Sequence, residues 1–170
     1  MKKVLSLLVF TMFVFYTSTT HAEASRPYEI VRDWSKGSTV SRFLESRDGF
    51  NETWLTEIVH SSNGRQYLSF QKMDGFKSTC TPYKSESDMI SSTWQFNGRS
   101  IQMVEWCLKY SDSNNSFLMA AIKTEEGESW VHDLFKKSDW VEIKQGRESK
   151  VRISGIDFSK NWSEAGGNAL

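Results

Sequence analysis

Short segments rich in apolar, β-branched and aromatic residues recur along the chain between polar turns, which is the pattern of β-strands joined by hairpins. Residues 53–60 and 67–70 are two such segments. Asn63-Gly64 lies between them, and Asn-Gly favours a type I′ hairpin turn because both residues tolerate positive φ. A two-residue loop at this point would place Val59 opposite Leu68.

The same hairpin signal occurs again further along the chain. Asn97-Gly98 separates residues 94–96 from the apolar-rich segment 101–108. A two-residue turn at this pair places Trp94 opposite Ile101. The sequence therefore predicts a second antiparallel hairpin.

Later segments extend the pattern of short strands joined by polar turns. Residues 117–123 follow the polar turn at 112–115, and residues 141–143 and 151–156 flank another turn at 145–147. Strands connected in this way pair with their neighbours as an antiparallel meander. We therefore expect a mainly antiparallel sheet built from hairpins.

One segment changes to the period of an α-helix. Four apolar residues fall on one helical face: Trp130, Val131, Leu134 and Phe135. Three acidic residues precede them: Glu125, Glu126 and Glu128. Lys136-Lys137 end the segment, so the charges at both ends oppose the helix dipole, and Ser129 is the expected N-cap.

Two shorter segments are also predicted to be helical. Val40, Phe43 and Leu44 fit one face of a helix over Ser38–Ser46. Phe158 and Trp162 are spaced by four and are followed by a Gly-Gly pair, which indicates one or two helical turns with a glycine stop. The predicted fold is an α+β domain, a mainly antiparallel sheet with one amphipathic helix packed late in the chain.

The first residues have the pattern of an export signal. Lys2 and Lys3 precede the uncharged apolar run Val4–Tyr16, which is shorter than the roughly 20 apolar residues that span a bilayer. Small residues follow it, and we expect cleavage after Ala22, with Ala24 as the alternative site. This predicts a signal peptide over residues 1–22, one globular domain over residues 23–170, and a periplasmic or secreted location; an uncleaved anchor is the alternative.

Cysteine content and charge narrow the function further. Cys80 and Cys107 are the only cysteines, and an even count in an exported chain predicts a disulfide.

Lys and Arg together number 21, as do Asp and Glu together, and no basic stripe is present. Nucleic acid is therefore not expected as a partner, because its binding depends on clustered Lys and Arg.

No catalytic or metal-binding motif stands out. His60 and His132 lack the spaced companions of a metal site, and no nucleophile elbow or phosphate-binding glycine loop occurs. We therefore expect no metal and no cofactor. Paired carboxylates, as in glycosidases, remain an alternative, and four acids lie near apolar residues: Glu57, Glu105, Asp133 and Glu142.

The aromatic content points to binding. The chain has 7 Trp, 5 Tyr and 11 Phe, and Trp and Tyr are enriched at binding surfaces. Trp34, Trp140 and Trp162 border charged or polar stretches and are the predicted surface tryptophans. Together with the acidic residues Glu125, Glu126 and Glu128 they are the predicted binding residues.

These observations predict an exported, non-catalytic protein that binds another protein, as an inhibitor or immunity factor for a toxin or hydrolase of the cell envelope. One alternative is an enzyme that acts on glycan or peptidoglycan through paired carboxylates. The other alternative is a structural or secretion-apparatus component, which would self-associate or accept a strand at a sheet edge.

Overall fold

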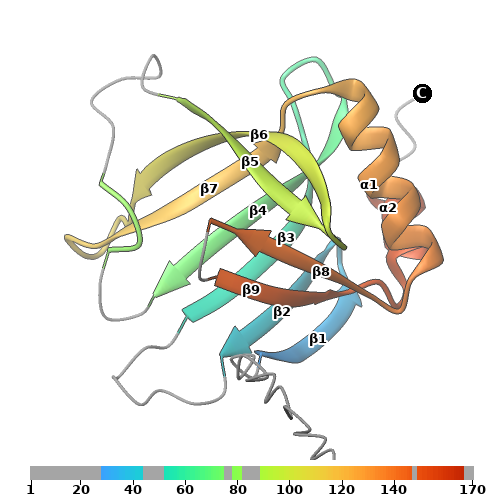
Figure 1. The fold of residues 1–170 in the computed structure, drawn as a ribbon, viewed down its shortest axis with the longest axis horizontal. Helices are drawn as coiled ribbons and strands as arrows, with labels where there is room; N and C mark the ends of the chain where they lie inside the picture. Colours follow the sequence, from blue (N-terminus) through green and yellow to red (C-terminus); the bar gives the residue numbers. More distant parts are fainter. Residues whose placement is uncertain (1–27, 44–51, 75–77, 82–88, 147–148, 167–170) are drawn as a thin grey trace, which may run out of the picture.

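A computed structural model describes residues 28–43, 52–74, 78–81, 89–146 and 149–166 (Figure 1). These residues form nine antiparallel strands in one sheet and two helices. The elements in chain order are β1 (Tyr28–Ser35), β2 (Ser38–Phe43), β3 (Glu52–His60), β4 (Gln66–Asp74), β5 (Ile90–Phe96), β6 (Arg99–Lys109), β7 (Ser116–Ile122), α1 (Glu125–Lys137), β8 (Trp140–Gln145), β9 (Ser149–Ser154) and α2 (Phe158–Ala165). The predicted α+β class with a mainly antiparallel sheet is confirmed, whereas the predicted signal peptide lies outside the described residues.

The sheet curls into a near-barrel with the strand order β1-β2-β3-β4-β7-β6-β5-β8-β9 (Figure 1). Side chains close the seam between its two edges. The indole Nε1 of Trp34 donates to the carbonyl of Ser154 at 2.6 Å, and the Ser41 hydroxyl donates to the carbonyl of Arg152 at 2.6 Å. Two backbone carbonyls of the edge strand β9 therefore have side-chain partners within the chain, which hinders pairing of this edge with another chain.

The two ends of the near-barrel differ. Helices α1 and α2 pack at the end where β3 ends and β4 begins, which we call the helix end (Figure 1). The opposite end, where β3 begins and β4 ends, is called the loop end. Aromatic side chains fill the interior between them, and Trp54, Phe70, Trp94 and Phe96 meet edge to face with ring centroids 5.4–5.9 Å apart. Full burial of one such side chain contributes roughly 2–3 kcal/mol to folding.

Helix α1 begins earlier than the sequence predicted. Its N-cap is Thr124, whose hydroxyl accepts a hydrogen bond from the amide of Gly127 at 3.1 Å, so the predicted cap Ser129 is wrong. The glutamates consequently lie inside the first turn, where they still favour the helix dipole. The predicted apolar stripe is confirmed, because Val131 and Phe135 are fully buried.

The helix predicted over Ser38–Ser46 is wrong within the described residues, because Ser38–Phe43 is strand β2. Its inward positions are the small polar residues Thr39 and Ser41, which hid the two-residue period. Both are buried at low cost because their hydroxyls donate to backbone carbonyls, that of Thr39 to Arg32 at 2.7 Å.

The two Asn-Gly hairpins turn differently. Asn97 and Gly98 both have positive φ, and Trp94 faces Ile101 as predicted. At the first hairpin Val59 faces Tyr67 rather than Leu68, because the loop is longer than two residues. There the Asn63 side chain accepts hydrogen bonds from the Ser61 hydroxyl and the Arg65 amide, which holds a wider loop.

Candidate functional site

Strand β7 carries apolar side chains on both faces, which is unusual for an antiparallel sheet with one face toward water. Leu118 and Ala120 point into the interior and are buried. Phe117 and Met119 alternate with them, so they point outward, and both are only partly buried. Strand β7 therefore presents an apolar surface on the outside of the sheet.

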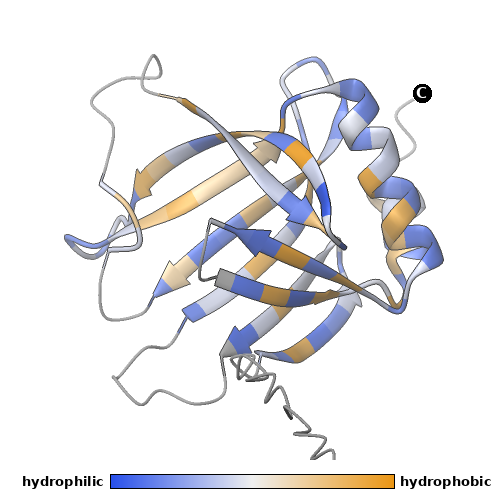
Figure 2. Cartoon of the chain, viewed as in Figure 1, coloured by the Kyte–Doolittle hydropathy of each residue, from blue (hydrophilic) through white to orange (hydrophobic). Residues whose placement is uncertain are grey.

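The strand register extends this surface across both neighbours of β7. In β6, Trp106 faces Met119 and Leu108 faces Phe117. The Tyr110 ring lies 4.8 Å from the Phe117 ring. Leu108 is 39% exposed and is the most exposed side chain of this group, whose other members are partly buried. Figure 2 shows the hydrophobic colouring that β7 and the end of β6 share.

On the other side of β7 the surface continues over β4 and β3. Gln71 faces Met119 on one side and Leu55 on the other, and Met73 lies two residues further along β4. We call the whole surface the outer aromatic face. Its members are Leu55, Met73, Trp106, Leu108, Tyr110, Phe117 and Met119.

Polar groups on and beside this face have defined partners. The Gln71 amide donates to Oε2 of Glu57 at 2.6 Å, which fixes a polar side chain in the middle of the face. At the rim, burial and then the carboxylates of Asp74 and Asp112 raise the pKa of Tyr110 above its usual value of 10.0. Tyr110 therefore keeps its phenolic proton at neutral pH and can donate a hydrogen bond there.

The prediction that Trp34 lies at the surface is wrong, because this side chain is only 2% exposed. Its charged neighbours Arg32 and Asp33 are exposed, but strand alternation turns Trp34 inward. Its ring packs edge to face on Phe135 and Phe158, with centroids 5.9 and 5.1 Å away. Trp34 therefore links β1 to both helices as part of the core.

The other two predicted tryptophans lie in different settings. Trp140 is 41% exposed on β8, and the Arg152 guanidinium of β9 lies 4.1 Å from its ring centroid. Trp162 is partly buried at the helix end, where it packs 4.4 Å from the ring of His132. Only Trp140 keeps the exposure on which its predicted binding role depends.

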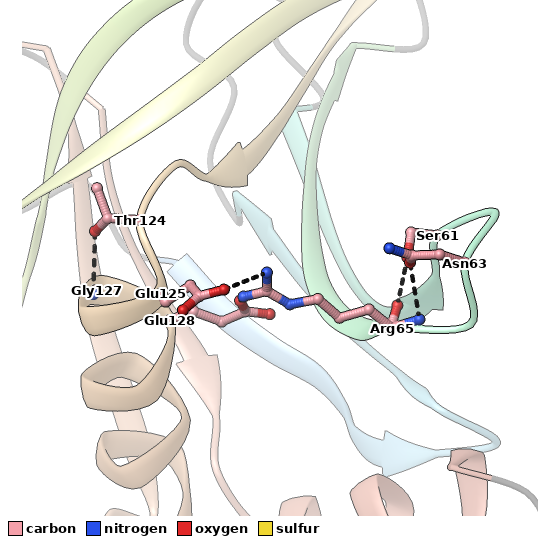
Figure 3. A network of polar contacts seen from close by, with 7 residues as sticks. All are labelled: Ser61, Asn63, Arg65, Thr124, Glu125, Gly127 and Glu128. Carbon is pink, nitrogen blue, oxygen red and sulfur yellow. Dashed lines mark hydrogen bonds and ion pairs between the residues drawn. The ribbon is translucent and has the colours of Figure 1, made fainter.

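The predicted acidic binding residues face arginines from neighbouring hairpins, and Figure 3 shows Arg65 beside Glu125 and Glu128. Arg65, in the loop after β3, forms ion pairs with Glu125, at 3.1 Å, and with Glu128. Arg99, after the second turn, lies 3.8 Å from Glu126. Glu128 is the most buried of the three, with 15% side-chain exposure. The start of α1 is therefore charge-balanced within the chain, although Glu125 and Glu126 remain exposed.

The four acids considered for catalysis occupy separate environments. Glu57 points outward and binds Gln71, Glu142 pairs with Lys150 at 2.9 Å, and Asp133 pairs with Lys137 on α1 at 3.4 Å. Only Glu105 is inward-facing, toward the loop end of the interior. The structure thus brings none of these four together as a pair.

A second inward carboxylate was missed by the sequence analysis. Glu52 is buried at the start of β3, and its Oε1 accepts from the Tyr28 hydroxyl at 2.5 Å and from Trp54 Nε1 at 2.6 Å. Lys72 Nζ lies 3.4 Å from its other oxygen. Glu52 is therefore held by donors on both oxygens. The available signal in the sequence was the position of Glu52 two residues before Trp54, which places both side chains on the same face of the strand.

The outer aromatic face had a signal in the sequence that the predicted surface tryptophans did not use. Residues 117–122 form a continuous apolar run, which is typical of a strand covered on both sides. One side of β7 is covered by the interior, whereas the described residues leave the other partly exposed.

No protein-family model, curated protein or solved structure matches this chain significantly. In the described residues, no group of three or more His, Cys, Asp or Glu side chains is arranged to hold a metal ion. Among the helices that the structure describes, none has the length and apolar character needed to cross a membrane.

Proposed function

We propose that this protein is an exported, non-catalytic binding protein whose outer aromatic face captures another protein of the cell envelope. An inhibitor or immunity factor for an envelope toxin or hydrolase is the role that this proposal favours. The predicted Cys80–Cys107 disulfide is present, which is compatible with a periplasmic or secreted location. The observation that carries the proposal is the apolar outer side of β7 and β6.

The composition of this face supports a protein partner. Trp, Tyr, Phe and Met are the residue types enriched in the cores of protein interfaces, and charged residues are depleted there. The face holds each of these types, and the carboxylate of Glu57, which lies on the same side of the sheet, is engaged by the Gln71 amide. The exposed side of β8 and β9, by contrast, pairs Trp140 with Arg152 and Glu142 with Lys150.

The position of the face also favours tight binding. Strands β4, β7 and β6 are neighbours in the middle of the sheet order and are hydrogen-bonded on both sides. Side chains on such strands lose little backbone freedom when a partner binds, so less of the contact energy is spent on ordering. A rigid aromatic surface is therefore suited to an inhibitor.

One observation favours an enzyme that uses paired carboxylates as the second candidate. Glu52 and Glu105 both point inward, each beside a tryptophan, and glycosidases require two such acids. Against this, Trp54 and Trp94 are almost fully buried and offer no ring face to a sugar. Glu52 is also engaged on both oxygens, which leaves it poorly placed to attack or protonate a substrate.

A structural role through strand addition has less support. The edges β1 and β9 face each other, and the side chains of Trp34 and Ser41 occupy backbone carbonyls of β9. An incoming strand would have to displace these contacts.

The test uses the wild-type protein and two variants as baits on extracts of the cell envelope. Trp106→Asp places a charge in the outer aromatic face, whereas Trp140→Asp places one on β8. A protein retained by wild type and by Trp140→Asp but lost by Trp106→Asp, and which then binds purified wild type, supports the proposal. If every retained protein binds Trp106→Asp equally well, the outer aromatic face is not the interface.

A further inference from the structure

Two carboxylate–indole units lie side by side in the loop-end half of the interior. In one, Trp54 Nε1 donates to Oε1 of Glu52 at 2.6 Å; in the other, Trp94 Nε1 donates to Oε1 of Glu105 at 2.5 Å. The two indole rings meet edge to face with centroids 5.6 Å apart. The units therefore share one environment and can be compared directly.

Each unit also has a hydroxyl donor on the same carboxylate oxygen. The Tyr28 hydroxyl donates to Oε1 of Glu52 at 2.5 Å, and the Ser92 hydroxyl donates to Oε1 of Glu105 at 2.6 Å. In both units one oxygen thus accepts two neutral hydrogen bonds. These bonds fix the carboxylate and direct its second oxygen away from the indole.

The second oxygen distinguishes the two units. Oε2 of Glu52 has the ammonium of Lys72 at 3.4 Å, and both side chains are nearly buried. Glu105 makes no ion pair within the described part of the chain, and its Oε2 has no hydrogen-bond donor there. Glu105 is only partly buried, so a cation that approaches from outside the chain can reach this second oxygen.

The surroundings of Glu105 add an apolar component. Ile90 faces Glu105 across strands β5 and β6, and it is 50% exposed on the same face of β5 as Ser92. Met89, the preceding residue, is also exposed. An alkyl chain can therefore lie against Ile90 while a charged group at its end reaches the carboxylate.

We propose that Glu105, positioned by Ser92 and Trp94, is a receptor for the ammonium group of a ligand that carries an alkyl chain. The Glu52–Lys72 pair is the template: the same carboxylate geometry is completed there by a primary ammonium. Such a group can belong to a free alkylamine or to a lysine side chain of a peptide. This site is inside the sheet and is independent of the outer aromatic face.

The test is a titration followed by NMR of the indole Nε1–H groups in the ¹⁵N-labelled protein. Trp94 donates to Glu105 and reports on it directly, whereas Trp54 donates to Glu52 and is the internal control. We expect n-butylammonium to shift the Trp94 signal saturably at concentrations of about 1 mM, with the Trp54 signal unchanged. Butan-1-ol, which has the same chain but no charge, should give no saturable shift.

Variants and a second probe complete the design. Glu105→Gln should abolish the saturable shift, and Ser92→Ala, which keeps the charge but loses one positioning hydrogen bond, should weaken binding several-fold. Nα-acetyl-lysine methylamide presents the same ammonium on a peptide; tighter binding of this probe identifies a protein lysine as the source, and tighter binding of butylammonium a free amine. An unresponsive Trp94 signal in folded wild type, or an equal response to butan-1-ol, overturns the proposal.

Discussion

Trp106 in β6 and Met119 in β7 face each other across the two strands on the outside of the sheet. The residues next to them in sequence, Cys107 and Leu118, are also register partners but are buried in the interior. Two adjacent apolar pairs thus point in opposite directions. The inner pair belongs to the core, and the outer pair belongs to the surface that we assign to partner binding.

Truncation of side chains in the outer aromatic face should therefore affect binding more than folding. We expect Trp106→Ala and Phe117→Ala each to weaken binding of the protein partner by at least about 2 kcal/mol, roughly 30-fold in Kd. Calorimetric titration measures the affinity, and thermal unfolding checks that each variant is folded. Unchanged affinity for both variants would contradict the assignment.

Trp140→Ala is the variant matched to Trp106→Ala. It tests Trp140, the one tryptophan that was predicted to bind and is exposed in the structure. Trp140 stacks on Arg152 at the surface, so its loss should change the free energy of unfolding by less than about 1 kcal/mol. We expect its effect on partner affinity to be smaller than that of Trp106→Ala in the same titration. The opposite order of effects would move the interface to β8 and β9.

The disulfide should contribute a large share of the stability. Cys80 and Cys107 are 27 residues apart in sequence, and closing a loop of that size stabilises a fold by about 3–4 kcal/mol on the chain-entropy account. Chemical denaturation of the oxidised protein and of the Cys80→Ala/Cys107→Ala double variant measures this difference. A difference below about 1 kcal/mol would show that the bridge is not a principal source of stability.

His132 should make stability depend on pH. Burial first, and then the charge of Lys136, lower its pKa below the usual 6.5, against the opposite effect of Asp133. The folded state therefore binds a proton less readily than the unfolded state, so stability is complete above pH 6.5 and is lost as the pH falls below it. Denaturation at about pH 7 and about pH 5 should show a larger loss for wild type than for His132→Phe. Equal losses would exclude His132 as the cause.

Arg65 should stabilise the start of α1 only modestly. It pairs with exposed Glu125 and with the more buried Glu128, so Arg65→Ala should cost about 0.5–1 kcal/mol and less at high salt. Arg99→Ala is the control. Arg99 lies 3.8 Å from Glu126 and both side chains are exposed, so their ion pair should contribute almost nothing to the free energy of unfolding. Denaturation at two salt concentrations compares the two variants. Indistinguishable effects would show that the burial of Glu128 does not strengthen its ion pair with Arg65.

The sequence predicted the elements whose pattern is local. Asn97-Gly98 determined both turn and register, since two positive φ angles suffice for that hairpin. The sequence did not predict strand β2, where Thr39 and Ser41 are buried and their hydroxyls donate hydrogen bonds to β1 and to the distant strand β9. Such contacts depend on closure of the sheet, which no local pattern encodes.

The candidate site was harder to predict for a related reason. The predicted surface tryptophans were chosen by their charged neighbours, but along a strand each neighbour points to the opposite side, and Trp34 turned inward. Trp106 belongs to the outer aromatic face only because β6 pairs with β7. The Glu105 receptor likewise depends on Ser92 and Trp94 of the neighbouring strand.

The most direct test of the central claim is oxidative footprinting of the protein alone and in complex with its captured partner. Met119, Met73 and Trp106 lie in the outer aromatic face, whereas Met89 and Trp140 are exposed elsewhere and are the controls. We predict that the complex protects the first group from oxidation and leaves the controls unchanged. Protection of Trp140 with undiminished oxidation of Trp106 and Met119 would contradict the claim, as would protection already complete in a dimer of this protein alone.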